Sequence, residues 1–320
     1  MNCIDMQKTS HLYSSLFNHR ALRLFLLTAF AVLLSSCSSQ ATKYFTESKL
    51  DISNVVLISI DGLRPDAINK QNAEHLIKLT KSGLYFPNAK TIQRSVTLPS
   101  HISMLTGLDI KQHKVSKNKS LPGHLSFPTI LEILKSQGKK TAALYSKKKL
   151  GFLFPPGSVD YIFGPGQNGI DYNQANANQL AAEFARIWNQ QNYHFTFIHI
   201  REPDAYGHQY GWMSNEYLNQ AIPLADKAIG NIINTISKGE KANNTLLIIT
   251  ADHGGKDKTH WSKRPEDLTI PWIATHSQLT PETITDTQVN IVDTAPTILH
   301  LFNAPLPKGI DGQVIKNFLP

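Results

Sequence analysis

The sequence predicts an α/β fold in which a mostly parallel central sheet carries helices on both faces. Short apolar runs alternate along the chain with longer segments of helical periodicity, as expected for strands that are connected by helices. The apolar runs are nearly continuous, which is typical of strands buried on both faces of a parallel sheet. With 320 residues the chain is long enough to bury one large hydrophobic core or two modest ones.

Five apolar runs have the length and composition of buried strands. The first is rich in β-branched residues and ends at an Asp-Gly turn, and the third runs into the polar segment REPD at 201–204. The fourth ends in ADHG at 251–254. We expect these strands at residues 55–60, 141–145, 195–200, 246–250 and 270–274.

Six further segments show helical periodicity together with helix start or stop signals. Gly83 and Gly107 follow two of them, where glycine commonly ends a helix. Pro99 occupies a position that the first turn of a helix tolerates, and Pro223 lies inside the longest pattern, where we expect a bend. We expect helices at residues 73–82, 100–106, 127–138, 178–190, 216–236 and 292–302.

The N-terminal segment differs from the rest of the chain. A basic flank that includes Arg20 and Arg23 precedes an apolar run at 24–34, which is too short for a normal transmembrane helix. The run ends in LSSC, which resembles the lipobox of bacterial lipoproteins and implies lipidation of Cys37. We therefore expect a lipoprotein signal peptide at 1–36, a lipidated N-terminus and polar tether at 37–53, and a globular domain at 54–320.

Two alternatives remain for this segment. The apolar run could be an uncleaved anchor with an incidental cysteine, and Met6 rather than Met1 could be the start. Ser38, not Asp, follows the cysteine. By resemblance to lipoproteins this predicts a lipid-anchored protein of the bacterial cell envelope, on the periplasmic face of the outer membrane.

The net charge of +8 is spread over short groups such as the three lysines at 147–149. A basic surface attracts anionic substrates or membranes, although a single charge run usually marks a solvated face. The sequence holds no basic patch with interleaved aromatic residues, so we expect no nucleic-acid readout.

Side chains that commonly ligate metals follow three of the predicted strands. They are Asp61 after the first strand, Asp204 and His208 after the third, and Asp252, His253 and His260 after the fourth. The spacing of four between Asp204 and His208 places both on one face of a helical turn. Oxygen and nitrogen ligands without a thiolate suit a catalytic Zn²⁺. Any one of the histidines alone would more often be an ordinary surface or core residue.

Thr97 is the candidate nucleophile. Its hydroxyl lies at the head of a predicted helix, where unpaired backbone N–H groups and the helix dipole favour phosphate. A metal ion on the alkoxide would activate it without a separate base. The alternative is a threonine that only caps the helix.

Taken in order, these motifs resemble the alkaline phosphatase superfamily and, within it, the nucleotide pyrophosphatase/phosphodiesterase group. The matching segments are SIDGLR at 59–64, TLPSH at 97–101 with LTG at 105–107, EPD at 202–204 with Gly207 and His208, ADHG at 251–254, and His260. The resemblance runs from about residue 54 to the C-terminus and implies an alkaline-phosphatase-like catalytic domain at 54–320.

The resemblance also implies roles for these residues. One zinc ion would be held by Asp61, Thr97, Asp252 and His253, and a second by Asp204, His208 and His260. Thr97 would attack phosphorus to form a phospho-threonine, which water activated at the second zinc would then hydrolyse. The expected partner is a small-molecule phosphate ester, nucleotide-like, with a phosphodiester or pyrophosphate bond.

Two departures concern the substrate and the branch of the superfamily. Phosphodiesterases of the family usually carry Asn after the proline of the nucleophile motif, where its amide donates to a phosphoryl oxygen; here Ser100 stands in this position and is the expected substrate-binding residue. Sulfatases of the superfamily need a Cys/Ser-x-Pro-x-Arg motif, and Thr97 with His101 argues against that branch.

Two other functions remain open on the sequence. A phosphomonoesterase would use the same two zinc ions and threonine, with Arg64 or Arg94 on the terminal phosphate. A lipoprotein with a relic site would bind a metal or an envelope component without catalysis. The aromatic residues Tyr206, Trp212 and Trp261 could stack on a nucleobase, although an aromatic at a site rim more often packs than recognises.

Overall fold

The computed structural model describes residues 50–119, 125–166 and 175–319. The residues that the structure describes belong to one compact unit. The predicted signal peptide, the lipidated Cys37 and the tether up to residue 49 lie outside the described residues. Within the described ranges, no helix has both the length and the apolar character needed to cross a membrane.

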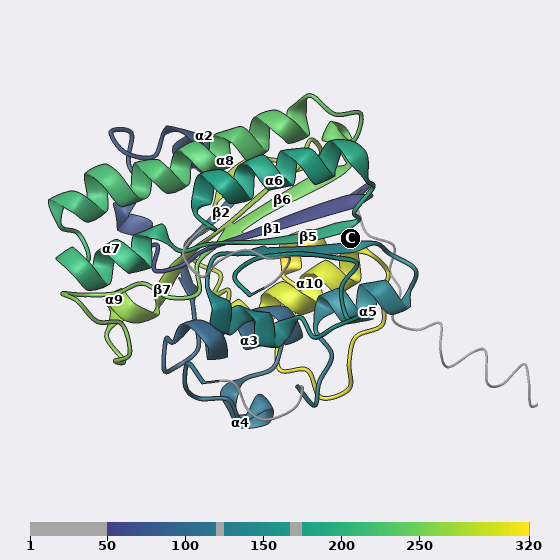
Figure 1. The fold of residues 1–320 in the computed structure, drawn as a ribbon, viewed down its shortest axis with the longest axis horizontal. Coiled ribbons are helices and arrows are strands. Elements are labelled where there is room, and N and C mark those ends of the chain that lie inside the picture. The colour runs from purple at the N-terminus through teal and green to yellow at the C-terminus, as the bar shows by residue number, and fades with distance from the viewer. Residues whose placement is uncertain (1–49, 120–124, 167–174, 320) are drawn as a thin grey trace, which may run out of the picture. The chain divides into compact units, whose positions relative to one another are not determined.

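An eight-stranded sheet forms the centre of this unit (Figure 1). Its strand order is β4-β3-β5-β1-β6-β7-β2-β8. The strands are β1 (Asn54–Ile60), β2 (Leu84–Lys90), β3 (Thr141–Tyr145), β4 (Tyr161–Phe163), β5 (Phe195–Ile200), β6 (Thr245–Thr250), β7 (Thr269–Thr275) and β8 (Glu282–Thr283). Only β7 runs antiparallel to its neighbours β6 and β2, so the predicted mostly parallel sheet is confirmed.

Helices cover both faces of the sheet. In Figure 1, α2, α6 and α8 lie on one face and α3, α5 and α10 on the other. The helices are α2 (Glu74–Ser82), α3 (Thr97–Thr106), α4 (Ile110–His113), α5 (Ile130–Ser136), α6 (Ala177–Gln190), α7 (Glu202–Tyr210), α8 (Ile222–Ser237), α9 (Pro265–Leu268) and α10 (Thr294–Leu301). Every residue of β1, β3, β5 and β6 is buried, which explains their continuous apolar sequences.

The sequence prediction lacked β4, β8, α4, α7 and α9, and prolines account for two further differences. Strand β2 was not predicted, since Pro87 and Asn88 interrupt its apolar pattern, and the register shifts between Phe86 and Ala89 at this point. Near Pro223, where a bend was expected, the structure has a π-helical turn at Tyr217–Ala221, directly before α8. A wider turn relieves the clash of a proline ring with the preceding carbonyls.

Candidate active site

The predicted site residues meet at the carboxyl ends of three neighbouring strands, β5, β1 and β6. Asp61 follows β1, Asp204 lies in the first turn of α7 after β5, and Asp252 and His253 follow β6. The turn after β1 packs directly on α7, because the Asp204 N–H donates to the Asp61 carbonyl at 2.9 Å. Gly62 makes this approach possible: its φ is +75°, and a Cβ there would lie 2.9 Å from Asp204 Cα.

The first ligand set consists of Asp61, Asp252 and His253. All three side chains are fully buried, and one ligand atom from each lies within 4.8 Å of the others. His253 Nε2 is 3.3 Å from both Asp61 Oδ1 and Asp252 Oδ2. The structure therefore brings together the three non-hydroxyl members of the first predicted set.

The second ligand set consists of Asp204, His208 and His260. Asp204 Oδ1 lies 3.3 Å from His208 Nε2 and 3.7 Å from His260 Nε2. Asp204 and His208 are one helical turn apart on α7, as their spacing predicted. His260 reaches them from the loop between β6 and α9, where its ring stacks on His253 with centroids 3.7 Å apart.

The three histidines of both sets share one orientation. Each places Nδ1 against a backbone carbonyl: His253 on Gly254, His208 on Lys258 and His260 on Ser95. A donating Nδ1–H leaves Nε2 with its lone pair, which is the form that ligates a metal. All three Nε2 atoms turn toward the aspartates of the sets.

Unpaired polar atoms gather between the two sets. Asp61 Oδ1, Asp204 Oδ1, Asp252 Oδ2 and His253 Nε2 are buried and have no hydrogen-bond partner among the residues that the structure describes. Each such atom costs on the order of 1–3 kcal/mol. Divalent cations would satisfy all four, and the oxygen and nitrogen donors suit zinc. The residues present therefore fit a metal centre.

The charges of the site depend on burial and on one another. Burial and the neighbouring charge of Asp61 raise the pKa of Asp252 well above its usual value. Burial and the adjacent His260 lower the pKa of His253 to about 3, so that its imidazole stays neutral. The neutral imidazole is the state that metal binding requires of a histidine, whereas the raised pKa of Asp252 means that this carboxyl group has to give up its proton when an ion binds.

Thr97 is the first helical residue of α3, which begins three residues earlier than predicted. The N-cap is Val96, whose side chain makes no capping hydrogen bond, and Thr97 is already inside the helix, so the capping alternative does not describe Thr97. The helix end offers fewer donors than expected, because the Leu98 N–H donates to Asn118 at 2.8 Å and Pro99 has none. An anion at Thr97 therefore needs another positive partner.

Lys147 supplies such a partner, and sequence reasoning missed it. Its Nζ lies 2.6 Å from Asp61 Oδ2, 2.5 Å from Asp204 Oδ2 and 3.5 Å from Thr97 Oγ1. Burial lowers the pKa of Lys147, but the two carboxylates outweigh burial and raise it above the usual value. The interpretation of the lysine run as a solvated face is thus wrong for its first member. Lys147 lies two residues after the end of β3, and nothing in the local sequence sets it apart from the two lysines that follow it.

Two buried histidines support the site from behind. His199 Nε2, on β5, lies 2.9 Å from Asp61 Oδ2. His101 Nδ1 lies 2.7 Å from the Thr97 carbonyl, and its Nε2 lies 2.8 Å from Ser59 Oγ. Both rings are fully buried and hold residues of the site in position. Neither was predicted, because a histidine within an apolar strand or helix has no distinctive spacing.

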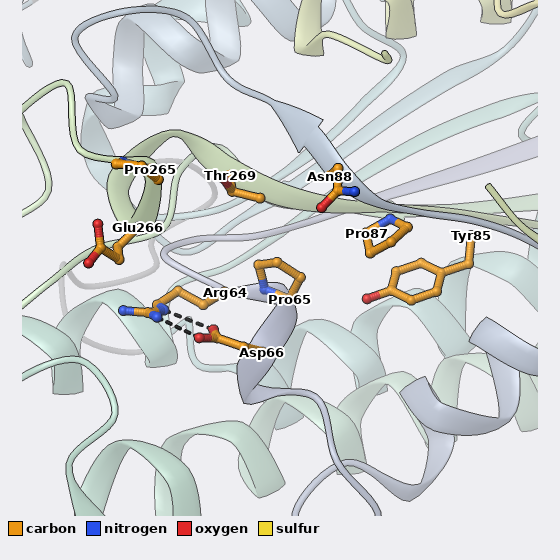
Figure 2. A pocket seen from close by; sticks show the side chains of 9 residues that line it. All are labelled: Arg64, Pro65, Asp66, Tyr85, Pro87, Asn88, Pro265, Glu266 and Thr269. Carbon is orange, nitrogen blue, oxygen red and sulfur yellow. Dashed lines mark hydrogen bonds and ion pairs between the residues drawn. The ribbon is translucent and has the colours of Figure 1, made fainter. Parts of the chain in front are cut away.

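Other predicted residues point elsewhere. Ser100 is fully buried, and its hydroxyl accepts a hydrogen bond from Thr91 at 3.2 Å; its substrate-binding role stays a prediction. Figure 2 shows Arg64 turned toward Asp66, with Nη2 and Oδ2 2.5 Å apart. Arg64 lines a cavity of about 420 Å³ whose wall includes neither Thr97 nor a member of either ligand set.

Comparison with known proteins identifies the family. The type I phosphodiesterase/nucleotide pyrophosphatase family model matches residues 55–269. The chain is similar to bis(5'-adenosyl)-triphosphatase ENPP4 of Pongo abelii, at 24% identity over 212 residues, covering 62% of this chain and 47% of the relative. It is also similar to human ectonucleotide pyrophosphatase/phosphodiesterase family member 1, at 25% identity over 214 residues, covering 62% of this chain and 23% of the relative. The chain thus spans half or less of the length of these relatives.

Solved structures share the fold. Murine ectonucleotide pyrophosphatase/phosphodiesterase 5 superposes with a TM-score of 0.65 at 16% identity, covering 83% of this chain and 100% of that chain. An alkaline phosphatase superfamily protein from Vibrio parahaemolyticus gives a TM-score of 0.63 at 18% identity, covering 82% of this chain and 69% of that chain. The predicted alkaline-phosphatase-like fold is confirmed.

Proposed function

Because this chain belongs to the type I phosphodiesterase/nucleotide pyrophosphatase family, we propose that it hydrolyses phosphodiester or pyrophosphate bonds in nucleotide-like substrates. The observation that carries the proposal is the convergence of two ligand sets on the space beside Thr97, where four buried polar atoms lack a partner among the described residues. Core packing alone gives no reason for such an arrangement.

The proposed cofactors are two zinc ions. Asp61, Thr97, Asp252 and His253 would hold one, and Asp204, His208 and His260 the other. When bound, the ions would polarise the phosphoryl group and favour the ionised form of the Thr97 hydroxyl.

The chain's own residues carry out the displacement. Thr97 Oγ1 loses its proton to water and forms a bond to phosphorus, while the bond from phosphorus to the leaving oxygen breaks and that oxygen keeps the electron pair. The product is a phospho-threonine, which a water molecule hydrolyses in the second step. Lys147, 3.5 Å from Thr97 Oγ1, binds a non-bridging phosphoryl oxygen and neutralises the charge that develops there.

The phosphomonoesterase alternative needs a cation on the terminal phosphate. Of the two arginines considered for this role, Arg64 is engaged by Asp66 and by the Gly255 carbonyl, to which its Nη1 donates at 3.0 Å. Because these contacts already engage the Arg64 guanidinium group, a diester or pyrophosphate substrate is favoured over a monoester. Arg94 lines a different cavity, together with Trp261.

The test uses the full-length protein, purified in detergent and loaded with zinc. Hydrolysis of a chromogenic phosphodiester and of the matching monoester is measured for wild type, Thr97→Val and Thr97→Ser, each with and without a chelator. We expect Thr97→Val and the chelator to abolish hydrolysis, and Thr97→Ser, which keeps a hydroxyl, to retain part of it. Diester hydrolysis that survives both treatments would contradict the proposed mechanism.

We also propose that Cys37 anchors the protein, through lipid, to the periplasmic face of the outer membrane. The support is the basic flank, the apolar run and the LSSC segment of the sequence. Radioactive palmitate should label wild type and Cys3→Ala but not Cys37→Ala. Label that persists in Cys37→Ala would overturn the lipoprotein assignment.

A further inference from the structure

A tight turn in the loop between β6 and α9 supports the second ligand set. It begins at Lys256 and ends at Thr259: the Lys256 N–H donates to the Thr259 carbonyl at 2.9 Å, and the Thr259 N–H donates to the Lys256 carbonyl at 3.1 Å. His260 directly follows the turn, and the Lys258 carbonyl inside it lies 3.0 Å from His208 Nδ1. The conformation of this turn therefore orients two of the three ligands of the second set.

The sequence of the turn does not by itself fix this conformation. Asp257 has a φ of +53°, in the left-handed region that residues other than glycine seldom adopt. Its carbonyl accepts from the Trp212 N–H at 2.7 Å, just beyond the C-terminal end of α7. A residue in this region keeps its conformation only where the surrounding structure holds it. The turn therefore depends on contacts from outside it.

Arg264, the residue before α9, supplies such contacts. Its Nη2 lies 3.4 Å from the Lys256 carbonyl oxygen, 3.5 Å from the Thr259 carbonyl oxygen and 3.1 Å from Thr259 Oγ1. Its Nη1 lies 3.5 Å from Asp257 Oδ2. The planar fork of a guanidinium group can donate to several acceptors at once, whereas the ammonium group of a lysine acts as a single point charge. Arg264 therefore joins both ends of the turn.

A buried carboxylate fixes the Arg264 guanidinium group in this place. Asp267 is fully buried, and its Oδ1 lies 3.2 Å from Arg264 Nη2. Its Oδ2 accepts from the Ser262 N–H at 2.9 Å and from Ser262 Oγ at 2.5 Å. Because a buried charge that loses its partner is strongly unfavourable, the two side chains hold each other in position. The ion pair thus fixes the guanidinium group against the turn.

The turn links this ion pair to the second ligand set. Among the residues that the structure describes, the side-chain hydrogen bonds of Arg264 and Asp267 all end on residues 256–267, and none reaches the first ligand set. The Asp267 carbonyl does accept from the Gly254 N–H at 2.9 Å, but this main-chain bond survives a change of side chain. Resting on the two-ion function proposed above, we propose that the Arg264–Asp267 pair positions His208 and His260 and thereby sets the affinity of the second ligand set for its ion.

The test measures how many zinc ions the metal-free full-length protein binds, and how tightly, by titration calorimetry. Wild type is compared with Arg264→Gln and Asp267→Asn. The control is Lys256→Gln, which removes a cation from the same turn whose Nζ pairs with Glu266 at 2.7 Å. Wild type and the control should bind two ions per chain. In the other two variants we expect one ion to stay tightly bound and the second to bind about 10- to 100-fold more weakly, the usual loss when a residue that supports a metal ligand is removed.

A reference variant identifies the ion that is weakened. His208→Ala removes a ligand of the second set directly, so the visible absorption of bound Co²⁺ that disappears in His208→Ala belongs to this set. Arg264→Gln should diminish the same absorption at limiting Co²⁺. Adding Arg264→Gln to His208→Ala should lower the metal content no further, since both changes act on one ion. A further loss in the double variant would show that Arg264 acts on the first set, against the proposal.

Chemical rescue separates positioning from a general loss of structure. Ethylguanidinium supplies the missing group and should restore the second ion to Arg264→Ala. It should not restore the ion to Arg264→Ala/Asp267→Asn, in which the carboxylate that holds the guanidinium group is also missing. Arg264→Lys keeps the charge beside Asp267 but not the fork, and it should bind the second ion weakly with a smaller loss of stability.

The outcomes distinguish this role from the proposed function. Equal binding of two ions by wild type and Arg264→Gln would overturn the role of the ion pair and leave the metal centre standing. Loss of both ions from Arg264→Gln that keeps the circular dichroism of wild type would do the same. Wild type that binds no zinc would refute the metal centre itself, and the positioning role with it.

Discussion

At the scale of single residues, Lys147 links parts of the site that lie far apart in the sequence. Its ammonium group touches Asp61 after β1 and Asp204 after β5, and it lies within 3.5 Å of the Thr97 hydroxyl. In the absence of other cations it offsets part of the charge of the two aspartates. Its place 3.5 Å from the Thr97 hydroxyl also suits it to hold a phosphoryl oxygen, as proposed above.

Lys147→Met should therefore have two separable effects. We expect kcat/KM for the diester to fall about 100-fold or more, the usual cost of removing one group that stabilises the transition state. Without metal, the variant should also lose about 3 kcal/mol of unfolding free energy, since two buried carboxylates lose their partner. Lys147→Arg keeps the charge and should preserve most of the stability. Urea unfolding with a chelator and initial rates with zinc measure the two effects; unchanged values for Lys147→Met would refute both.

His113 offers a residue-scale test of pH dependence away from the site. Its Nδ1 accepts from the Val115 N–H at 3.2 Å and its Nε2 lies 3.1 Å from Ser103 Oγ. Burial lowers the pKa of His113 to about 4. The unfolded state then binds more protons between pH 4 and 6.5, so the stability contributed by neutral His113 is lost as the pH falls through this window. We expect about 2 kcal/mol less stability at pH 5 than at pH 7 from this residue, and a smaller difference in His113→Gln, by urea unfolding.

At the scale of elements, helix α2 depends on a neighbour for its start. Its own N-cap, Ala73, provides no side-chain hydrogen bond. Instead Asp226, buried on α8, accepts from the His75 N–H at 3.0 Å and the Leu76 N–H at 2.8 Å. The carboxylate also complements the positive end of the α2 dipole. One side chain thus joins two helices on the same face of the sheet.

Asp226→Ala should lower the unfolding free energy by about 1–3 kcal/mol, because two backbone donors lose their acceptor. Asp226→Asn keeps an acceptor oxygen and should cost less. The neighbouring Lys227→Ala, an exposed position on the same helix, serves as the control. Thermal or urea unfolding measures the stability of the three variants and of wild type. Equal stability of wild type and Asp226→Ala would exclude a capping role.

Some of the strands and site residues could be predicted from the sequence, and others could not. Strands β1, β5 and β6 were predictable because burial on both faces demands continuous apolar runs, and the ligands directly after them were visible for the same reason. Strand β2 was not, because Pro87 breaks its pattern. Lys147 could not be distinguished from the two lysines that follow it. Its position in the site depends on β3 lying next to β5, and the order of strands in a sheet cannot be predicted from local sequence.

At the scale of the whole molecule, three buried aspartates lie together at one edge of the sheet. Lys147 compensates part of their charge, and the four unpaired atoms show that compensation is incomplete among the described residues. Such a centre costs stability unless cations occupy it. Folding and metal binding are therefore linked.

Chelation should lower the melting temperature of the protein, and stoichiometric zinc should restore it. For an ion present at 1,000 times its dissociation constant, the expected stabilisation is about 4 kcal/mol. Scanning calorimetry measures the melting temperature of the metal-free and the zinc-reloaded protein. The same measurement is made on Asp204→Asn, in which one ligand set is disturbed. A melting temperature that is indifferent to both chelator and zinc would argue against a metal centre.

The backbone hydrogen bond between Asp61 and Asp204 has a consequence for how this centre fills. The Asp61 carbonyl accepts from the Asp204 N–H, so the main chain ties a ligand of one set to a ligand of the other. An ion that orders Asp61 also orders Asp204, and the second ion then meets ligands that have already lost their freedom. We expect cooperative loading, in which half-filled molecules are rare and a calorimetric zinc titration shows one steep transition instead of two separate ones.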